Sequence, residues 1–127
     1  MTTQNRQTVE RYMDAFARLD HAAVLSCLTD DVEWVLPGVY HHRSREAFDR
    51  EIENDAFTGR PLIRVDRITE QGDVVMVEGR VRANPRSGGH IHLAFVDAFE
   101  MRDGRIARLI SYLMQVPDAY AETRFAG

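Results

Sequence analysis

The spacing of hydrophobic residues changes about half-way along the chain. In the first part, apolar side chains recur every three or four positions, which is typical of amphipathic helices. Asp20 stands where the N-cap of a second helix is expected. The pattern predicts helices and one short strand, with helices over residues 3–19, 21–28 and 45–57 and the strand over residues 32–36.

After Pro61 the apolar residues alternate with polar ones, which is the period of a β-strand. This period predicts strands over residues 62–69, 74–84, 90–101 and 105–116. Asp103-Gly104 is a strong signal for a two-residue hairpin, and strands joined by such short turns pair antiparallel. Helices followed by strands indicate an α+β fold. We therefore expect a single domain over residues 1–127, with helices packed on a strongly bent sheet.

One polar residue interrupts an apolar face in the strand over residues 90–101. Successive side chains of a strand point to opposite faces, so one face should hold Ile91, Leu93, Phe95, Asp97, Phe99 and Met101. Asp97 is the only polar member of this set. A carboxylate is costly to bury without a partner, and burial raises its pKa by up to roughly 3–5 units. Asp97 is thus a candidate for function, or a structural carboxylate satisfied by a neighbour such as Tyr12.

The neighbouring strand places small residues on the same face. Gly79 and Ala83 are expected to leave room there, beside aromatic side chains such as Trp34. An apolar ligand site needs this combination of space, rings and few polar groups. The pattern fits an internal pocket and a filled core equally well.

The charge, the cysteine count and the length of the apolar runs argue against several classes of function. The net charge is -4 and the two signs are interspersed, which argues against a nucleic-acid-binding face. The single cysteine, Cys27, excludes an internal disulfide and a multi-thiolate zinc site. No apolar run approaches a signal peptide or the ~20 residues that span a bilayer, so we expect a cytoplasmic protein without membrane contact.

Two histidines share one strand face. His90 and His92 are two positions apart, a spacing that suits two ligands of one metal ion. The pattern offers no third ligand near them. We therefore predict no metal site and no cofactor.

Several segments together resemble a known superfamily. They follow one another over about residues 8–115: ERY at 10–12, DDVEWVLPG at 30–38, REAF at 45–48, GDVV at 72–75, VEGRV at 77–81 and FEMRDGRI at 99–106. Their order and spacing resemble the nuclear-transport-factor-2-like superfamily, in particular its SnoaL-like and ketosteroid isomerase-like members. The resemblance implies a cone-shaped roll, with N-terminal helices packed on a bent, mainly antiparallel sheet around an internal pocket. It also implies frequent homodimers. The mixed apolar and polar outer face of the sheet predicts such a dimer, with Val96, Ala98, Ile110 and Tyr112 as candidate contacts.

The resemblance assigns roles only in part. Tyr12 and Asp97 fall where ketosteroid isomerase-like enzymes have the tyrosine and the protonated aspartic acid that stabilise an oxyanion. Leu36 falls at the position of the aspartate base and cannot accept a proton, which argues against steroid isomerisation by that mechanism. His42, near the expected pocket mouth, is the candidate base in its place, although His41 and His42 also fit two solvated loop histidines.

Other members of the superfamily fit no better. The arginine and aspartates of limonene epoxide hydrolase-like enzymes correspond to Gly79, Val81 and Ser111, so that set of residues is absent. The polar pocket positions of scytalone dehydratase-like enzymes correspond to Leu93 and Phe95. The reaction therefore does not follow from the resemblance.

The sequence leaves two hypotheses for function. The first is an isomerase, dehydratase or cyclase acting on a small apolar oxygenated metabolite, with Asp97, Tyr12 and His42 as catalytic residues. The expected substrate contacts are pocket-lining side chains, namely Trp34, Leu36, Tyr40, Phe95, Ser111 and Leu113. The second is a protein of the same fold that binds a ligand without chemistry or serves in assembly.

Overall fold

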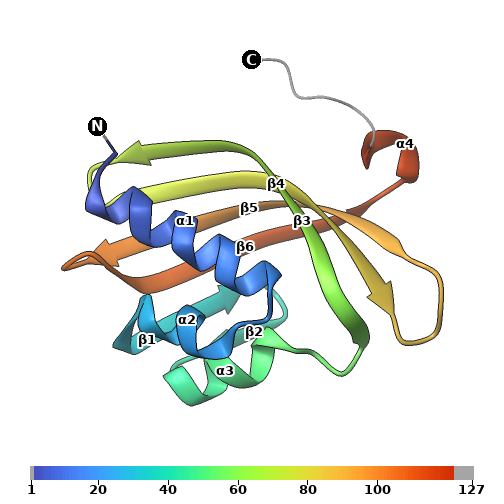
Figure 1. The fold of residues 1–127 in the computed structure, drawn as a ribbon, viewed down its shortest axis with the longest axis horizontal. Coiled ribbons are helices and arrows are strands. Elements are labelled where there is room, and N and C mark those ends of the chain that lie inside the picture. The colour runs from blue at the N-terminus through green and yellow to red at the C-terminus, as the bar shows by residue number, and fades with distance from the viewer. Residues whose placement is uncertain (1, 122–127) are drawn as a thin grey trace.

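A computed structural model describes residues 2–121 of the chain (Figure 1). The helices are α1 (Gln4–Ala17), α2 (His21–Ser26), α3 (Arg45–Ile52) and α4 (Asp118–Ala121). The strands are β1 (Leu28–Leu36), β2 (Tyr40–His42), β3 (Phe57–Gln71), β4 (Val74–Pro85), β5 (Ile91–Arg102) and β6 (Arg105–Val116). The predicted α+β class is confirmed. Among the described helices, none is long and apolar enough to cross a bilayer.

The strands form one curled, unclosed sheet in the order β2-β1-β6-β5-β4-β3. All neighbours pair antiparallel except β1 and β6, which run parallel. The helix α1 lies across the concave face of the sheet, while α2 and α3 lie beside β1 and β2 (Figure 1). The core between these layers contains fully buried side chains such as Val9, Phe48 and Phe99. Cys27 is also fully buried there, as a free thiol.

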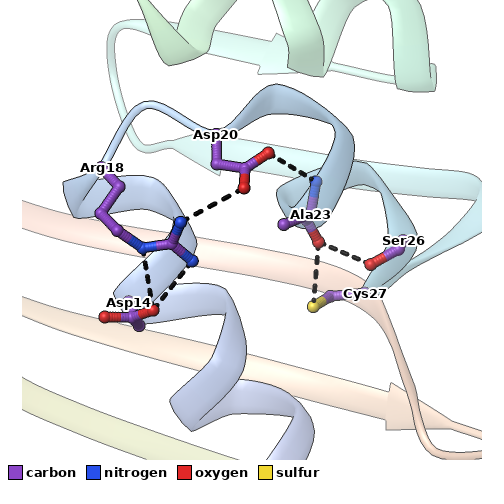
Figure 2. A network of polar contacts seen from close by, with 6 residues as sticks. All are labelled: Asp14, Arg18, Asp20, Ala23, Ser26 and Cys27. Atoms are coloured by element: carbon purple, nitrogen blue, oxygen red, sulfur yellow. Dashed lines mark hydrogen bonds and ion pairs between the residues drawn. The ribbon is translucent and has the colours of Figure 1, made fainter.

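A polar network fixes the corner between the first two helices (Figure 2). Arg18 forms ion pairs with Asp14 on its own helix and with Asp20. Asp20 accepts a hydrogen bond from the Ala23 backbone N–H and is thereby the N-cap of α2, as the sequence predicts. Leu19 adopts a φ of 54° at this corner, so the chain reverses within very few residues.

The hairpin between β5 and β6 follows the sequence prediction. Asp103 and Gly104 have φ values of 53° and 75°, and both positions of a type I′ turn require positive φ. The Thr8 hydroxyl donates a hydrogen bond of 2.7 Å to the Gly104 carbonyl, which ties α1 to the turn. The hairpin therefore positions the helix that carries Tyr12.

Some element boundaries differ from the prediction because strands are longer than their alternating stretches. The strand β1 begins at Leu28 and β3 begins at Phe57, residues that helical spacing assigned to the ends of helices. Pro61 does not start a strand but lies within β3, an edge strand, where the pairing register shifts between Thr58 and Leu62. Proline is tolerated at such an irregularity because its missing N–H costs no ladder hydrogen bond.

Candidate functional site

A cavity of about 610 Å³ opens between the end of α1, the helix α3 and the neighbouring ends of the strands. Four of the predicted contact residues, Trp34, Leu36, Tyr40 and Leu113, line it. Its volume lies within the range of small-molecule sites, about 300–1,000 Å³. Glu51 of α3 contributes a carboxylate to the lining. Most of the lining surface is apolar, but Glu53, Asp55 and Arg86 also contribute charged groups to it.

A second cavity of about 590 Å³ is lined by β5 and β6 side chains from both faces of the sheet, among them Val96 and Tyr112 of the outer face. Phe95 and Ser111, the remaining two predicted contact residues, line this second cavity. Leu36 and Leu113 line both cavities. The six residues thus border two adjacent spaces.

Asp97 lies in the middle of β5, next to Val77 of β4 and Ser111 of β6. Its neighbours on the same face, Phe95 and Phe99, are buried, which places the carboxyl group on the concave side, as alternation predicts. Burial raises the pKa of Asp97 from 3.8 to about 7, while a hydrogen bond from Ser111 acts in the opposite direction. Asp97 nevertheless keeps part of its surface accessible. Asp97 lines neither of the two cavities, but its cross-strand partner Ser111 lines the second.

The hydroxyl of Ser111 connects Asp97 to the aromatic wall. The Trp34 indole Nε1–H donates a hydrogen bond of 3.0 Å to Ser111 Oγ, and both residues are buried. Because the indole N–H occupies a lone pair of this oxygen, the Ser111 proton is available to the Asp97 carboxylate. The chain of donors fixes the orientation of the Asp97 carboxyl group.

Tyr12 of α1 reaches the same region. Its ring packs edge-on against Phe99, with centroids 5.2 Å apart, and the residue is 2% exposed. Burial raises the pKa of Tyr12 well above its ordinary value, and the nearby charge of Asp97 raises it further, followed by Tyr40 and Cys27. Tyr12 is therefore a neutral hydroxyl at physiological pH, and a negative charge on Asp97 further disfavours its ionisation.

The short strand β2 brings two more titratable side chains to the concave face. It pairs with β1 so that Tyr40 is opposite Leu36 and His42 is opposite Trp34, and cross-strand partners share a face. Burial raises the pKa of Tyr40, and the charges of Glu51 and Asp97 add to that effect. The sequence predicted a loop here, which is wrong.

His42 forms a pair with a residue that sequence reasoning missed. His42 Nε2 lies 2.9 Å from Glu51 Oε1, and the two side chains are 26% and 20% exposed. The imidazole also stacks on Tyr40, with ring centroids 4.2 Å apart. Among the described residues that line the first cavity are Tyr40 and Glu51, but not His42. The position of Glu51, one turn after the buried Phe48, was the signal that this acidic residue faces inward.

The small residue Gly79 does not provide the room that its size suggests. A Cβ atom at this position would lie 2.7 Å from the ring of Phe95 and 2.3 Å from the Arg64 carbonyl oxygen. Phe95 therefore fills the space above Gly79, and the glycine permits this close approach of ring and backbone.

Comparison with known proteins places this geometry in a family. A model of the SnoaL-like domain matches residues 9–109. The chain belongs to the SnoaL-like domain family. The predicted resemblance is therefore confirmed. None of the curated proteins matches this SnoaL-like chain.

Solved structures share the fold of this SnoaL-like protein. A proposed polyketide cyclase from Xanthomonas campestris pv. campestris is 27% identical, with a TM-score of 0.78 over 86% of this chain and 89% of that one. An epoxide hydrolase of M. tuberculosis, described as LEH-like, is 21% identical, with a TM-score of 0.77 over 89% of this chain and 84% of that one. TerC, co-crystallized with polyporic acid, is 24% identical, with a TM-score of 0.77 over 94% of this chain and 97% of that one. Epoxide hydrolysis and polyketide cyclisation are different reactions, so these likenesses support the SnoaL-like fold and not one reaction.

Proposed function

We propose that this SnoaL-like protein is an acid/base enzyme of the isomerase, dehydratase or cyclase type, acting on a small, largely apolar, oxygenated molecule. The observation that carries the proposal is the Asp97 carboxyl group, whose pKa is raised to about 7 by burial on the concave face. Perturbed carboxyl groups in apolar clefts are concentrated at functional sites. Binding of polyporic acid by TerC supports a small-molecule ligand for this fold.

The proposed role of Asp97 is to donate a hydrogen bond. With a pKa of about 7, a large fraction of the group is protonated at neutral pH. Protonated Asp97 and the neutral Tyr12 hydroxyl would both donate to a substrate carbonyl oxygen. In a water-poor site such donors stabilise the oxyanion that develops in the transition state. Ser111 and Trp34 would hold the carboxyl group in place.

The proposed proton acceptor is His42. Glu51 accepts a hydrogen bond from the Nε2–H, which leaves the Nδ1 lone pair to take a proton. Nδ1 would take a proton from the carbon next to the substrate carbonyl. The electron pair of the broken C–H bond would move onto the carbonyl oxygen, which accepts hydrogen bonds from Asp97 and Tyr12. Return of the proton to another carbon completes an isomerisation. Glu51 would stabilise the imidazolium formed meanwhile.

The test is turnover of a panel of small unsaturated ketones by the intact protein. For any ketone converted by the wild type, Asp97→Asn and Tyr12→Phe should each lower kcat by about 10²-fold, the usual cost of losing one oxyanion donor. Circular dichroism should show both variants folded.

The matched control is His41→Gln. His41 precedes His42 but contacts Glu33, with a distance of 2.7 Å from its Nε2 atom to Glu33 Oε1, and it faces away from the cavity. His42→Gln should lose turnover while His41→Gln keeps it. Equal rates in Asp97→Asn and the wild type would refute the proposed mechanism.

A second candidate function is ligand binding without chemistry. It is favoured by Leu36, an apolar residue where ketosteroid isomerase-like enzymes carry their base, at the wall of both cavities. A ligand that copurifies and is recovered chemically unchanged, with no conversion across the panel, would support this function over catalysis.

We further infer that two copies associate through the outer face of the sheet. On this face Tyr112 is 52% and Met114 is 66% exposed, next to the partly buried Val96, Ala98 and Ile110. Apolar surface of this kind is typical of an interface. Sedimentation at micromolar concentration should give a dimer for the wild type and a monomer for Tyr112→Glu. A wild-type monomer would contradict the inference.

A further inference from the structure

Three potential metal ligands meet at the end of the sheet that carries α4. They are His90, His92 and Asp118, and one ligand atom of each lies within 4.8 Å of the other two. His92 Nε2 is 3.3 Å from Asp118 Oδ1. The imidazole rings of His90 and His92 are 5.3 Å apart and nearly perpendicular. The ring nitrogens of the two histidines and the Asp118 carboxylate therefore lie close together around one position.

The topology explains this meeting. His90 directly precedes β5 and His92 is the second residue of this strand, and their imidazole rings lie 5.3 Å apart. Val116, at the end of β6, is the cross-strand partner of His92. After Val116 the chain turns at Pro117 into α4, which contacts β5, and the first residue of this helix is Asp118. The third ligand thus comes from a segment whose direction the strand pattern does not predict.

We propose that His90, His92 and Asp118 bind a divalent zinc ion. Two imidazoles and one carboxylate are common zinc ligands, at about 2.0–2.2 Å from the metal. In a tetrahedral site, ligand atoms at such distances lie about 3.3–3.6 Å apart. The existing 3.3 Å contact between His92 and Asp118 meets this spacing. His90 is exposed, so rotation of its side chain brings its nitrogen to the same point.

The charges around the cluster have both signs, so the ion would be held by direct bonds to its ligands and not by long-range attraction. The Asp118 carboxylate offsets part of the ion's charge, and its side chain is 78% exposed, so it reorients freely. Arg82 of β4 is the cross-strand partner of His92 and opposes cation binding. Water can fill the fourth position, because the cluster offers three protein ligands and two of them are exposed.

The ion would act as a clamp on α4. Tyr120 of this helix lines the second cavity together with Ala94 and Val96. Joining Asp118 to His90 and His92 would fix the helix, and with it one wall of that cavity. Metal binding would thereby order the C-terminal end of the described chain.

The experiment is titration of the full, tag-free protein with zinc in competition with a chromophoric chelator. We expect one ion per chain, and more than about tenfold weaker binding in each of His90→Ala, His92→Ala and Asp118→Asn. Cobalt should give visible absorption bands of a tetrahedral site in the wild type and not in the three ligand variants. Zinc should also slow proteolysis after Tyr120 in the wild type.

The control variant is His21→Ala. His21 also has two carboxylate neighbours, but Asp49 is 2.6 Å from its Nδ1 and Glu53 is 2.5 Å from its Nε2. Because they contact opposite ring nitrogens, the three groups share no common metal position, so this variant should bind zinc as the wild type does. Failure of the wild type to bind zinc, or unchanged affinity in the three ligand variants, would overturn the proposed site. Unchanged proteolysis would overturn the clamp.

Discussion

Lowering the pH from 8 to 5 should raise the free energy of unfolding through Asp97 by about 2–3 kcal/mol. Burial raises the pKa of Asp97 in the folded chain from 3.8 to about 7. Between these values the folded state holds a proton that the unfolded state has released. Acid therefore stabilises the fold through this group, and the stabilisation is lost as the pH rises through about 7.

The measurement is urea denaturation at several pH values for the wild type and Asp97→Asn. His21 changes stability in the same direction, because hydrogen bonds to Asp49 and Glu53 raise its pKa. The difference between the two proteins isolates Asp97. The variant should lack the stabilisation in acid and be the more stable of the two at pH 8. Parallel stability curves would show that Asp97 is ionised and solvated in the folded state.

Gly79→Ala should lower the free energy of unfolding by about 1–3 kcal/mol, the usual cost of overpacking a core. The added Cβ would lie 2.3 Å from the Arg64 carbonyl oxygen, which belongs to the backbone and moves only with its strand. The Phe95 ring, 2.7 Å away, would also have to shift, and it lines the second cavity. Thermal and urea denaturation measure the loss of stability.

A double-mutant cycle with Phe95→Leu separates the two contacts. Leucine removes the ring but leaves the Arg64 carbonyl, so the double variant should be more stable than the sum of the single losses predicts. Wild-type stability in Gly79→Ala would mean that β3 and β4 separate easily at this point.

The sequence predicts best what depends on neighbours in the chain. The Asp103-Gly104 hairpin follows from two residues that tolerate positive φ, and the face of Asp97 follows from alternation alone. The strand β2 was missed because Tyr40, His41 and His42 have no alternation of their own. They become a strand only by pairing with β1.

Two partners in the candidate sites could not be predicted, because they depend on contacts between segments that are distant in the sequence. The spacing of Glu51 from Phe48 indicates that it faces inward, but its contact with His42 forms only when α3 packs beside β2. Asp118 is an ordinary surface carboxylate until α4 folds back towards β5. Such partners depend on tertiary packing, which neither period nor propensity encodes.

The chain contains one tryptophan, Trp34, and the fold places it at the wall of the first cavity. Its indole N–H is bound to the same hydroxyl that serves Asp97. Its fluorescence consequently reports on one location only, without background from other indoles. Its emission should therefore change as Asp97 ionises at a pH of about 7.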